Sequence, residues 1–139
     1  MTGREAYLQG LFAALSADPG LQALGVRFGR SIWHAVRRAE GPTLVVSRGR
    51  DVPVDTNIGR TTRKLVVMVS AVVWSSTPDT ESDRIFELSH PVVMQFDADG
   101  IAGVEEGPTG EPQTGDEDGG IGIYTMQYAV TYQTATHAL

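Results

Sequence analysis

The chain has 139 residues, 41% of them hydrophobic and 20% charged, which indicates one folded domain and excludes a disordered or fibrous chain. It has no cysteine, which excludes disulfides, a thiolate nucleophile and cysteine-ligated zinc. It has no apolar run of the roughly 18 to 20 residues that span a membrane and no secretory signal layout. We therefore expect a protein made and used in the cytosol, or carried out of it as part of something larger, with no membrane partner.

The charge is divided unevenly along the chain. Residues 1–64 carry ten basic and five acidic side chains, a net charge of +5, whereas residues 65–139 carry one basic and twelve acidic, a net charge of −11. Such a chain is complementary either to itself within its fold or to further copies. The overall charge of −6 argues against a general nucleic-acid binder, because an acidic chain repels phosphate unless its basic face is segregated.

The first elements are predicted to be helical. Residues 4–15 have the apolar spacing of one helical face, at Leu8, Leu11, Phe12 and Leu15. Asp18 suits an N-cap and Pro19 a first helical position, so a short second helical turn is expected over 21–24.

Strands are predicted next. Residues 26–30 are compatible with a short extended piece, and 43–47 are rich in β-branched residues after a Gly-Pro break. Residues 48–59 are expected to form a loop or a hairpin, because Pro53 interrupts the strand pattern.

The segment 63–76 is the strongest predicted strand, and both of its faces are largely apolar. One face holds Leu65, Val67, Val69, Ala71 and Val73, and the other holds Val66, Met68, Ser70, Val72 and Trp74. A strand with one solvated face alternates apolar and polar residues. We therefore expect either helices on both faces or a second copy of the protein on one, and with only two good helices predicted, self-association is favoured.

The acidic half begins with a predicted helix from residue 77, which Pro91 should kink or end near His90. A turn is expected at 97–100 and a short strand at 101–104. Residues 105–120 contain many glycines, prolines and acids and are predicted to be a mobile loop.

The last predicted strand, 122–133, alternates cleanly, and the tail 134–139 is expected to fray. One face of this strand holds Tyr124, Tyr128 and Tyr132. A row of aromatic side chains is more often a wall of a core or of an interface than a platform that stacks a ligand, and we favour the first interpretation.

No catalytic pattern emerges from the sequence. The three histidines, His34, His90 and His137, are scattered and lack the spacing of metal ligands or of a catalytic set. The acidic run Asp116, Glu117 and Asp118 could collect a divalent cation, but a solvated acidic loop is the favoured interpretation. We expect no enzyme activity and no cofactor.

Four segments, taken in order, carry a resemblance to a known family. They are Phe28-Gly29-Arg30, the proline-led Gly41-Pro42-Thr43-Leu44-Val45-Val46, Arg84-Ile85 with His90-Pro91-Val92-Val93-Met94, and Gly115-Asp116-Glu117-Asp118-Gly119 before a Tyr-rich strand. Together they resemble the tail terminator (minor tail protein U, or tail completion) family of long-tailed bacteriophages. The resemblance spans roughly residues 4–134.

The resemblance implies an assembly and no reaction. Family members have a small α/β fold, and six copies form a ring that caps the tail tube, stops its polymerisation and offers the head a docking surface. It implies a virion protein assembled in the host bacterial cytoplasm. Its partners would be further copies, the tail tube protein and a head-completion or connector protein, with at most weak contact to DNA in the lumen.

We therefore predict a single α+β domain over 1–139, with a mainly antiparallel four- to five-stranded sheet and two helices. The candidate subunit-interface residues are Arg48, Arg50, Arg60, Arg63, Val66, Met68, Trp74, Asp116, Glu117 and Asp118. A head–tail connector or neck protein is the first alternative function. A small-ligand-binding domain that uses the tyrosine row and the acidic loop is the second.

Overall fold

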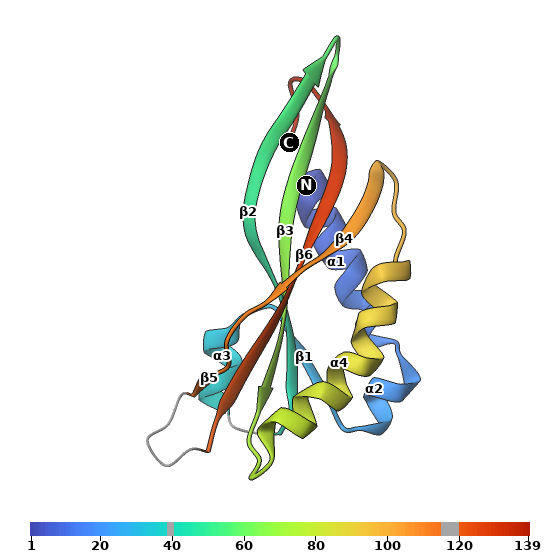
Figure 1. The fold of residues 1–139 in the computed structure, drawn as a ribbon. Helices are drawn as coiled ribbons and strands as arrows, with labels where there is room; N and C mark the ends of the chain where they lie inside the picture. The colour runs from blue at the N-terminus through green and yellow to red at the C-terminus, as the bar shows by residue number, and fades with distance from the viewer. Residues whose placement is uncertain (39–40, 115–119) are drawn as a thin grey trace.

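The structure is a computed structural model that describes residues 1–38, 41–114 and 120–139, and these residues form one six-stranded sheet and four helices (Figure 1). The strands are β1 (Arg27–Gly29), β2 (Thr43–Asn57), β3 (Arg60–Val73), β4 (Ile101–Thr109), β5 (Gln113–Thr114) and β6 (Gly122–Ala135). The helices are α1 (Gly3–Ser16), α2 (Pro19–Ala23), α3 (Ile32–Arg38) and α4 (Pro78–Gln95). The predicted α+β class with a mainly antiparallel sheet is confirmed. The sheet has more strands than expected, and there are two more helices.

The sheet is ordered β1-β2-β3-β6-β4, with the short β5 also pairing with β6. Only β1 and β2 run parallel, while the other pairs are antiparallel. Strand β3, the predicted two-sided apolar strand, therefore lies between β2 and β6 at the centre of the sheet.

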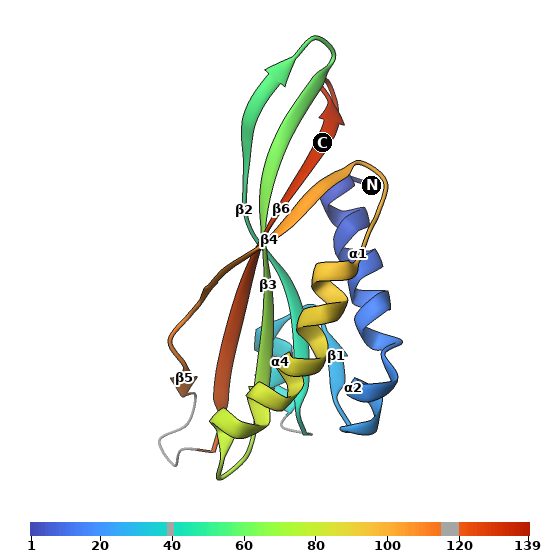
Figure 2. The same cartoon turned by 45° about the vertical axis from the view of Figure 1, so that its right-hand side comes forward.

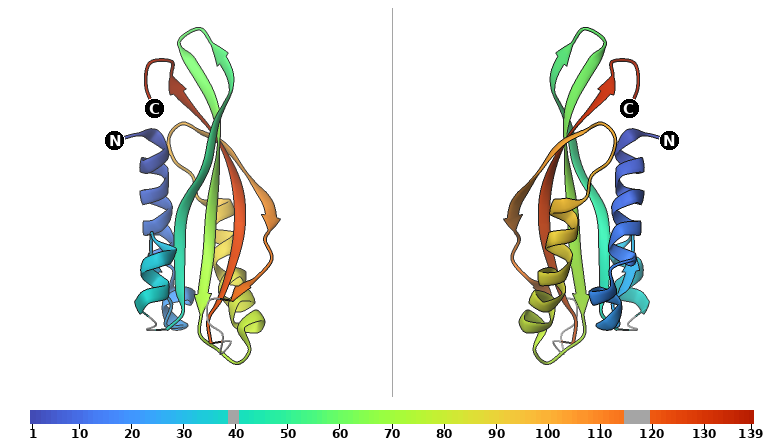
Figure 3. Two further views of the ribbon diagram at one scale, coloured as in Figure 1. Left: turned by 90° about the vertical axis from the view of Figure 1, so that its left-hand side faces the viewer. Right: turned by 90° about the vertical axis from the view of Figure 1, so that its right-hand side faces the viewer.

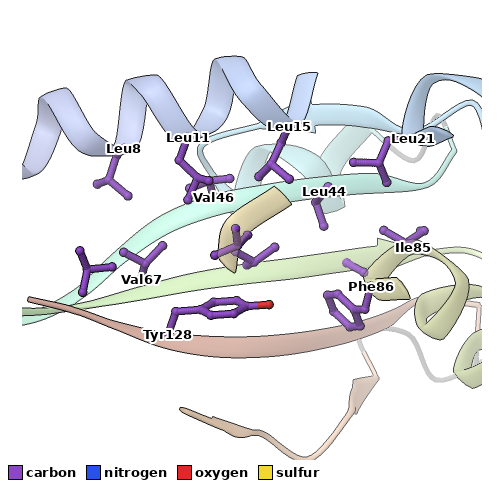
Figure 4. Packing of buried hydrophobic residues seen from close by; sticks show 14 of the residues in the cluster. Leu8, Leu11, Leu15, Leu21, Leu44, Val46, Val67, Ile85, Phe86 and Tyr128 are labelled. Atoms are coloured by element: carbon purple, nitrogen blue, oxygen red, sulfur yellow. The ribbon is translucent and has the colours of Figure 1, made fainter. Parts of the chain in front are cut away.

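Helices α1, α2 and α4 cover one face of the sheet (Figure 2). Thr2 and Asp18 cap the first two helices, accepting hydrogen bonds from the backbone N–H groups of Glu5 at 3.2 Å and Leu21 at 3.0 Å. The apolar stripe of α1 is buried against the strands, as predicted (Figure 4). The core between helices and sheet includes Leu8, Leu11, Leu15, Leu21, Leu44, Val46, Val67, Ile85, Phe86 and Tyr128.

Among the described residues, helices cover the opposite face of the sheet at one end only. There α3, which the sequence did not predict, packs Ala35 on Val45 and Val72 in a second small core. The remainder of this surface, which we call the open face, includes the half-buried residues Ser47, Val66, Met68, Gln127 and Ala129. From the sequence we expected either helices on both faces of β3 or a second copy of the protein on one face. In the structure, helices cover one face of β3 and one end of the other.

A hairpin extends the sheet beyond the helices (Figures 1 and 3). Strands β2 and β3 stay paired up to Asn57 and Arg60, and Gly59 closes the turn with a φ of +79°, a conformation that glycine adopts without strain. We call residues 52–64 the arm. The hairpin alternative for 48–59 is thus confirmed, but the loop is not, because 48–57 belong to β2. Pro53 is tolerated there because the edge of a sheet needs no N–H on its outer side.

The predicted end of the helix at His90 is wrong, because α4 continues through Pro91 to Gln95. Pro91 lies on the exposed side of the helix, while Val93 is fully buried. The burial of the last turn outweighs the one backbone hydrogen bond that proline cannot make.

Two further expectations for the acidic half are wrong. Within the predicted mobile loop 105–120, residues 105–109 belong to β4 and Gln113–Thr114 form β5, since β6 is long enough to pair with both, whereas residues 115–119 lie outside the described residues. The tail does not fray in the structure. Strand β6 reaches Ala135, Thr136 donates its N–H to the carbonyl of Gly59 at 3.1 Å, and Leu139 accepts from Gly3 at 2.9 Å.

Candidate assembly surfaces

The four predicted interface arginines lie on β2 and β3. Arg48 and Arg50 are exposed on the outer strand β2, and Arg60 is exposed at the tip of the arm. Arg63 is half-buried, and its Nε lies 3.5 Å from the hydroxyl of Thr134. Lys64 adds a fifth cation to this region, so the structure gathers on two adjacent strands basic groups that are spread along the sequence.

The apolar and acidic candidates are separated. Val66 and Met68 lie on the open face, as an interface residue would, whereas Trp74 packs within the chain against the small core under α3. The acidic candidates Asp116, Glu117 and Asp118 lie outside the described residues, and so does the divalent cation considered for them.

The arm also carries apolar side chains that no sequence pattern singled out. Ile58 at its tip is fully exposed, and Val52 and Val54 are 40% and 52% exposed. A cluster of exposed large apolar residues between cations is typical of a surface that another protein covers.

A buried ion pair fixes the base of the arm to α1. Arg4 Nη1 lies 2.7 Å from Asp51 Oδ2, and the Tyr132 hydroxyl donates to the same oxygen at 2.6 Å. The Asp51 side chain is only 6% exposed. Burial raises the pKa of Tyr132 to about 12, and the hydrogen bond to Asp51 adds to this shift. The three residues are too far apart in sequence for any local pattern to predict this contact.

A second ion pair secures the start of the free part of β2. Arg30 contacts both carboxylate oxygens of Glu5, at 3.0 and 3.3 Å, and its Nε donates to the carbonyl of Val46 at 2.9 Å. The hydrogen bonds from Arg30 hold the pKa of the Glu5 carboxyl below its usual value. Arg30 belongs to the Phe28-Gly29-Arg30 segment of the resemblance, and its role in this structure is to join α1, β1 and β2.

A third polar contact joins α4 to the sheet. His90 Nδ1 lies 2.8 Å from the Tyr128 hydroxyl, and Nε2 lies 3.2 Å from Glu106 Oε1. Burial raises the pKa of Tyr128 to about 12, and the charge of Glu106 contributes. Since Tyr128 is only 1% exposed, the tyrosine row is a wall of the core here, as favoured from the sequence.

These contacts decide how the uneven charge is used. Between described residues, the arginine–carboxylate ion pairs join Arg4 to Asp51 and Arg30 to Glu5, and both lie within residues 1–64. Neither of these two pairs joins the basic first half to the acidic second half. Complementarity between copies gains from this over complementarity within the fold.

Two hollows of the described surface are smaller than the usual site for a small molecule. One of about 180 Å³ lies between β1 and α3, beside Phe28 and His34, and one of about 220 Å³ lies between α2 and α4, beside Leu24 and Arg84. Sites for small molecules usually have about 300 to 1,000 Å³. A shallow groove of about 370 Å³ runs beside Met68 on the open face, walled by residues 110–113.

Nothing among the described residues gathers three or more His, Cys, Asp or Glu side chains in a metal-binding arrangement. In the same residues, no helix is long and apolar enough to cross a bilayer. No protein-family model matches the chain, and no curated protein matches its sequence.

Proposed function

We propose that this protein is a phage tail terminator, a virion protein that forms a homo-oligomeric, hexameric ring at the end of the tail tube. The ring would end polymerisation of the tube and offer the head a docking surface. The observation that carries the proposal is the arm, which projects past the helices with exposed apolar and basic side chains.

The arm supports assembly because it has little core of its own. Ile58 and Val54 are exposed, and covering them in an interface releases about 25 cal/mol per Å² of apolar surface. A single arm extending from a compact body fits a ring in which each copy contacts the next, because a head-to-tail contact joins two different patches of one chain.

The order of the four family-like segments is the second support. Phe28-Gly29-Arg30 is in β1 and its exit, the proline-led segment opens β2, and Arg84-Ile85 with His90–Met94 lies in α4. The segment from Gly115 to Gly119 lies outside the described residues.

Negative-stain images of the purified protein test the ring directly. We expect closed rings of uniform size, binding to tail tubes, and an oligomer by light scattering at micromolar concentration. A strictly monomeric protein that also leaves tail tubes uncapped would overturn the proposal.

Complementation distinguishes the terminator from a head–tail connector. A phage that lacks a terminator should make abnormally long tails or tails without heads. A phage that lacks a connector should make finished but unattached tails, and that outcome would assign the protein to the neck instead.

A further inference from the structure

The two edges of the sheet are unpaired over most of their length. Strand β1 covers the outer side of β2 only along residues 43–45, and the next carbonyl, that of Val46, accepts from Arg30. Along 47–57 no described strand lies on that side, and none lies on the outer side of β4. An open strand edge presents a row of free N–H and C=O groups to another chain.

The strand directions make these two edges compatible. The pairs β2–β3, β3–β6 and β6–β4 are all antiparallel, so β2 and β4 run in opposite directions. A second copy in the same orientation can therefore place its β4 beside β2 and continue the antiparallel alternation. This contact is head-to-tail, and repeated copies close into a ring when the rotation between them fits.

The charges on the two edge strands also favour contact between β2 of one copy and β4 of another. Beside the body of the protein, β2 exposes Arg48 and Arg50, while the neighbouring Asp51 is already paired with Arg4. Strand β4 exposes Glu105 and Glu106 and has no basic residue. Pairing two β2 edges would oppose arginines, and pairing two β4 edges would oppose glutamates, which is destabilising in either case.

We propose that β2 of one copy pairs with β4 of the next as adjacent antiparallel strands, with residues 47–52 against 103–107. Arg48 and Arg50 then face the partner's glutamates. Pro53 and Pro108 bound the paired stretch, because neither can donate a backbone hydrogen bond. Closure of these contacts into a ring rests on the proposed function, whereas the edge pairing itself does not.

Charge reversal on each edge tests the pairing. Arg50→Glu and Glu105→Arg are the best pair, because Glu106 already contacts His90 within the chain. Each variant alone opposes like charges at every interface. We expect a rise of about tenfold in the concentration at half assembly at low salt, measured by sedimentation velocity.

Mixing the two variants should restore assembly. In a ring with an even number of copies, alternating Arg50→Glu and Glu105→Arg copies make every interface complementary. The double variant, with both changes in one chain, restores every interface as well. We expect both to assemble within about twofold of the unmodified protein.

Matched controls separate position from net charge. Arg37→Glu on α3 and Glu87→Arg on α4 make the same charge changes on exposed residues away from both edges, and they should leave assembly unchanged. Far-UV circular dichroism verifies folding of every variant. The edge pairing would be overturned if Arg50→Glu and Glu105→Arg each assembled normally alone, or if their mixture failed to regain assembly.

The same experiment separates this inference from the proposed function. Rings that form regardless of the edge charges leave the terminator proposal standing and remove the edge pairing. Open filaments that depend on the edge charges support the pairing and remove the closed ring. A protein that stays monomeric at every concentration overturns the edge pairing, and it overturns the terminator proposal as well when it also leaves tail tubes uncapped.

Discussion

Asp51 is the residue at which α1, β2 and β6 meet. Its carboxylate binds Arg4 and accepts a hydrogen bond from the hydroxyl of Tyr132. The Asp51 side chain is nearly excluded from solvent. A carboxylate this buried is stable only while its partners are present, because an unpaired buried charge is costly. The contact therefore sets where the arm leaves the body.

Substituting Asp51 by Asn should destabilise the protein measurably. We expect a loss of about 2 to 3 kcal/mol in the free energy of unfolding, measured by urea denaturation, and about 1 kcal/mol for Tyr132→Phe, which removes one hydrogen bond. Asp55→Asn, on the exposed part of the same strand, is the matched control and should change stability by less than about 0.5 kcal/mol. Equal losses at Asp51 and Asp55 would show that the buried contact contributes nothing.

The four tyrosines should make the fold sensitive to alkali. The pKa of Tyr7, Tyr124, Tyr128 and Tyr132 is raised from 10.0 to about 12, by burial first of all. Above pH 10 the unfolded chain releases these protons while the folded chain keeps them, so the free energy of unfolding falls as the pH rises from 10 towards 12.

This alkaline transition is measurable by tyrosinate absorbance. The folded protein should titrate well above the urea-unfolded chain, and thermal melting should fall over the same interval. Coincident titration curves for folded and unfolded protein would contradict the prediction.

At the scale of elements, the turn of the arm depends on Gly59. Its φ of +79° costs an L-amino acid with a Cβ about 1 to 2 kcal/mol. Gly59→Ala should therefore lower the free energy of unfolding by that amount in urea denaturation.

Gly29→Ala is the matched control for the turn. Gly29 is the last residue of β1, and its φ is not in the left-handed region. A Cβ added at Gly29 meets no atom within 4 Å. It should cost far less than Gly59→Ala, and a larger loss at Gly29 would contradict the account of the turn.

The sequence predicted well the elements in which the spacing of apolar residues marks a single buried face. Helix α1 and strand β6 are examples, since each buries the stripe that its spacing marked. Helix α3 was missed because, among its side chains that the structure describes, only Ala35 is buried, which is too little for a period to be visible. The outer part of β2 was obscured by Pro53 and by exposure on both faces.

The candidate site was predictable only in part, for a related reason. The arginines were recognisable by charge, but their gathering on two adjacent strands depends on strand order, which no local pattern encodes. The exposed Ile58 and the contact of Asp51 with Arg4 depend on tertiary structure alone. Trp74, chosen for its place in an apolar strand, turned out to pack beneath a helix that the sequence did not predict.

At the scale of the whole molecule, the basic residues of β2 and β3 and the acidic second half should attract each other between copies. Reversing Arg48 and Arg60 to Glu should weaken assembly, more at low salt than at high salt, because salt screens exposed charges beyond about 10 Å at 0.1 M. Light scattering over a salt series measures the effect.

Arg37 and Arg84 provide the control for net charge. Both are exposed on helices, and reversing them changes the total charge by the same amount. Equal weakening by the two pairs would assign the effect to overall repulsion and would show that the position of the cations on β2 and β3 has no influence on assembly.

The arm continues the core of the sheet, because β2 and β3 run through both. The ladder between β3 and β6 is continuous from Arg60 to Val73, whereas the ladder between β2 and β3 shifts register between Arg48 and Asp51 and between Pro53 and Asp55. Fraying that starts at the tip therefore has an uninterrupted route into the body along β3 and β6. A partner that binds the tip of the arm prevents fraying from starting there. Binding at the tip should therefore slow amide hydrogen exchange in the core strands far from the contact, and the exchange rate of the core then measures whether the arm is bound.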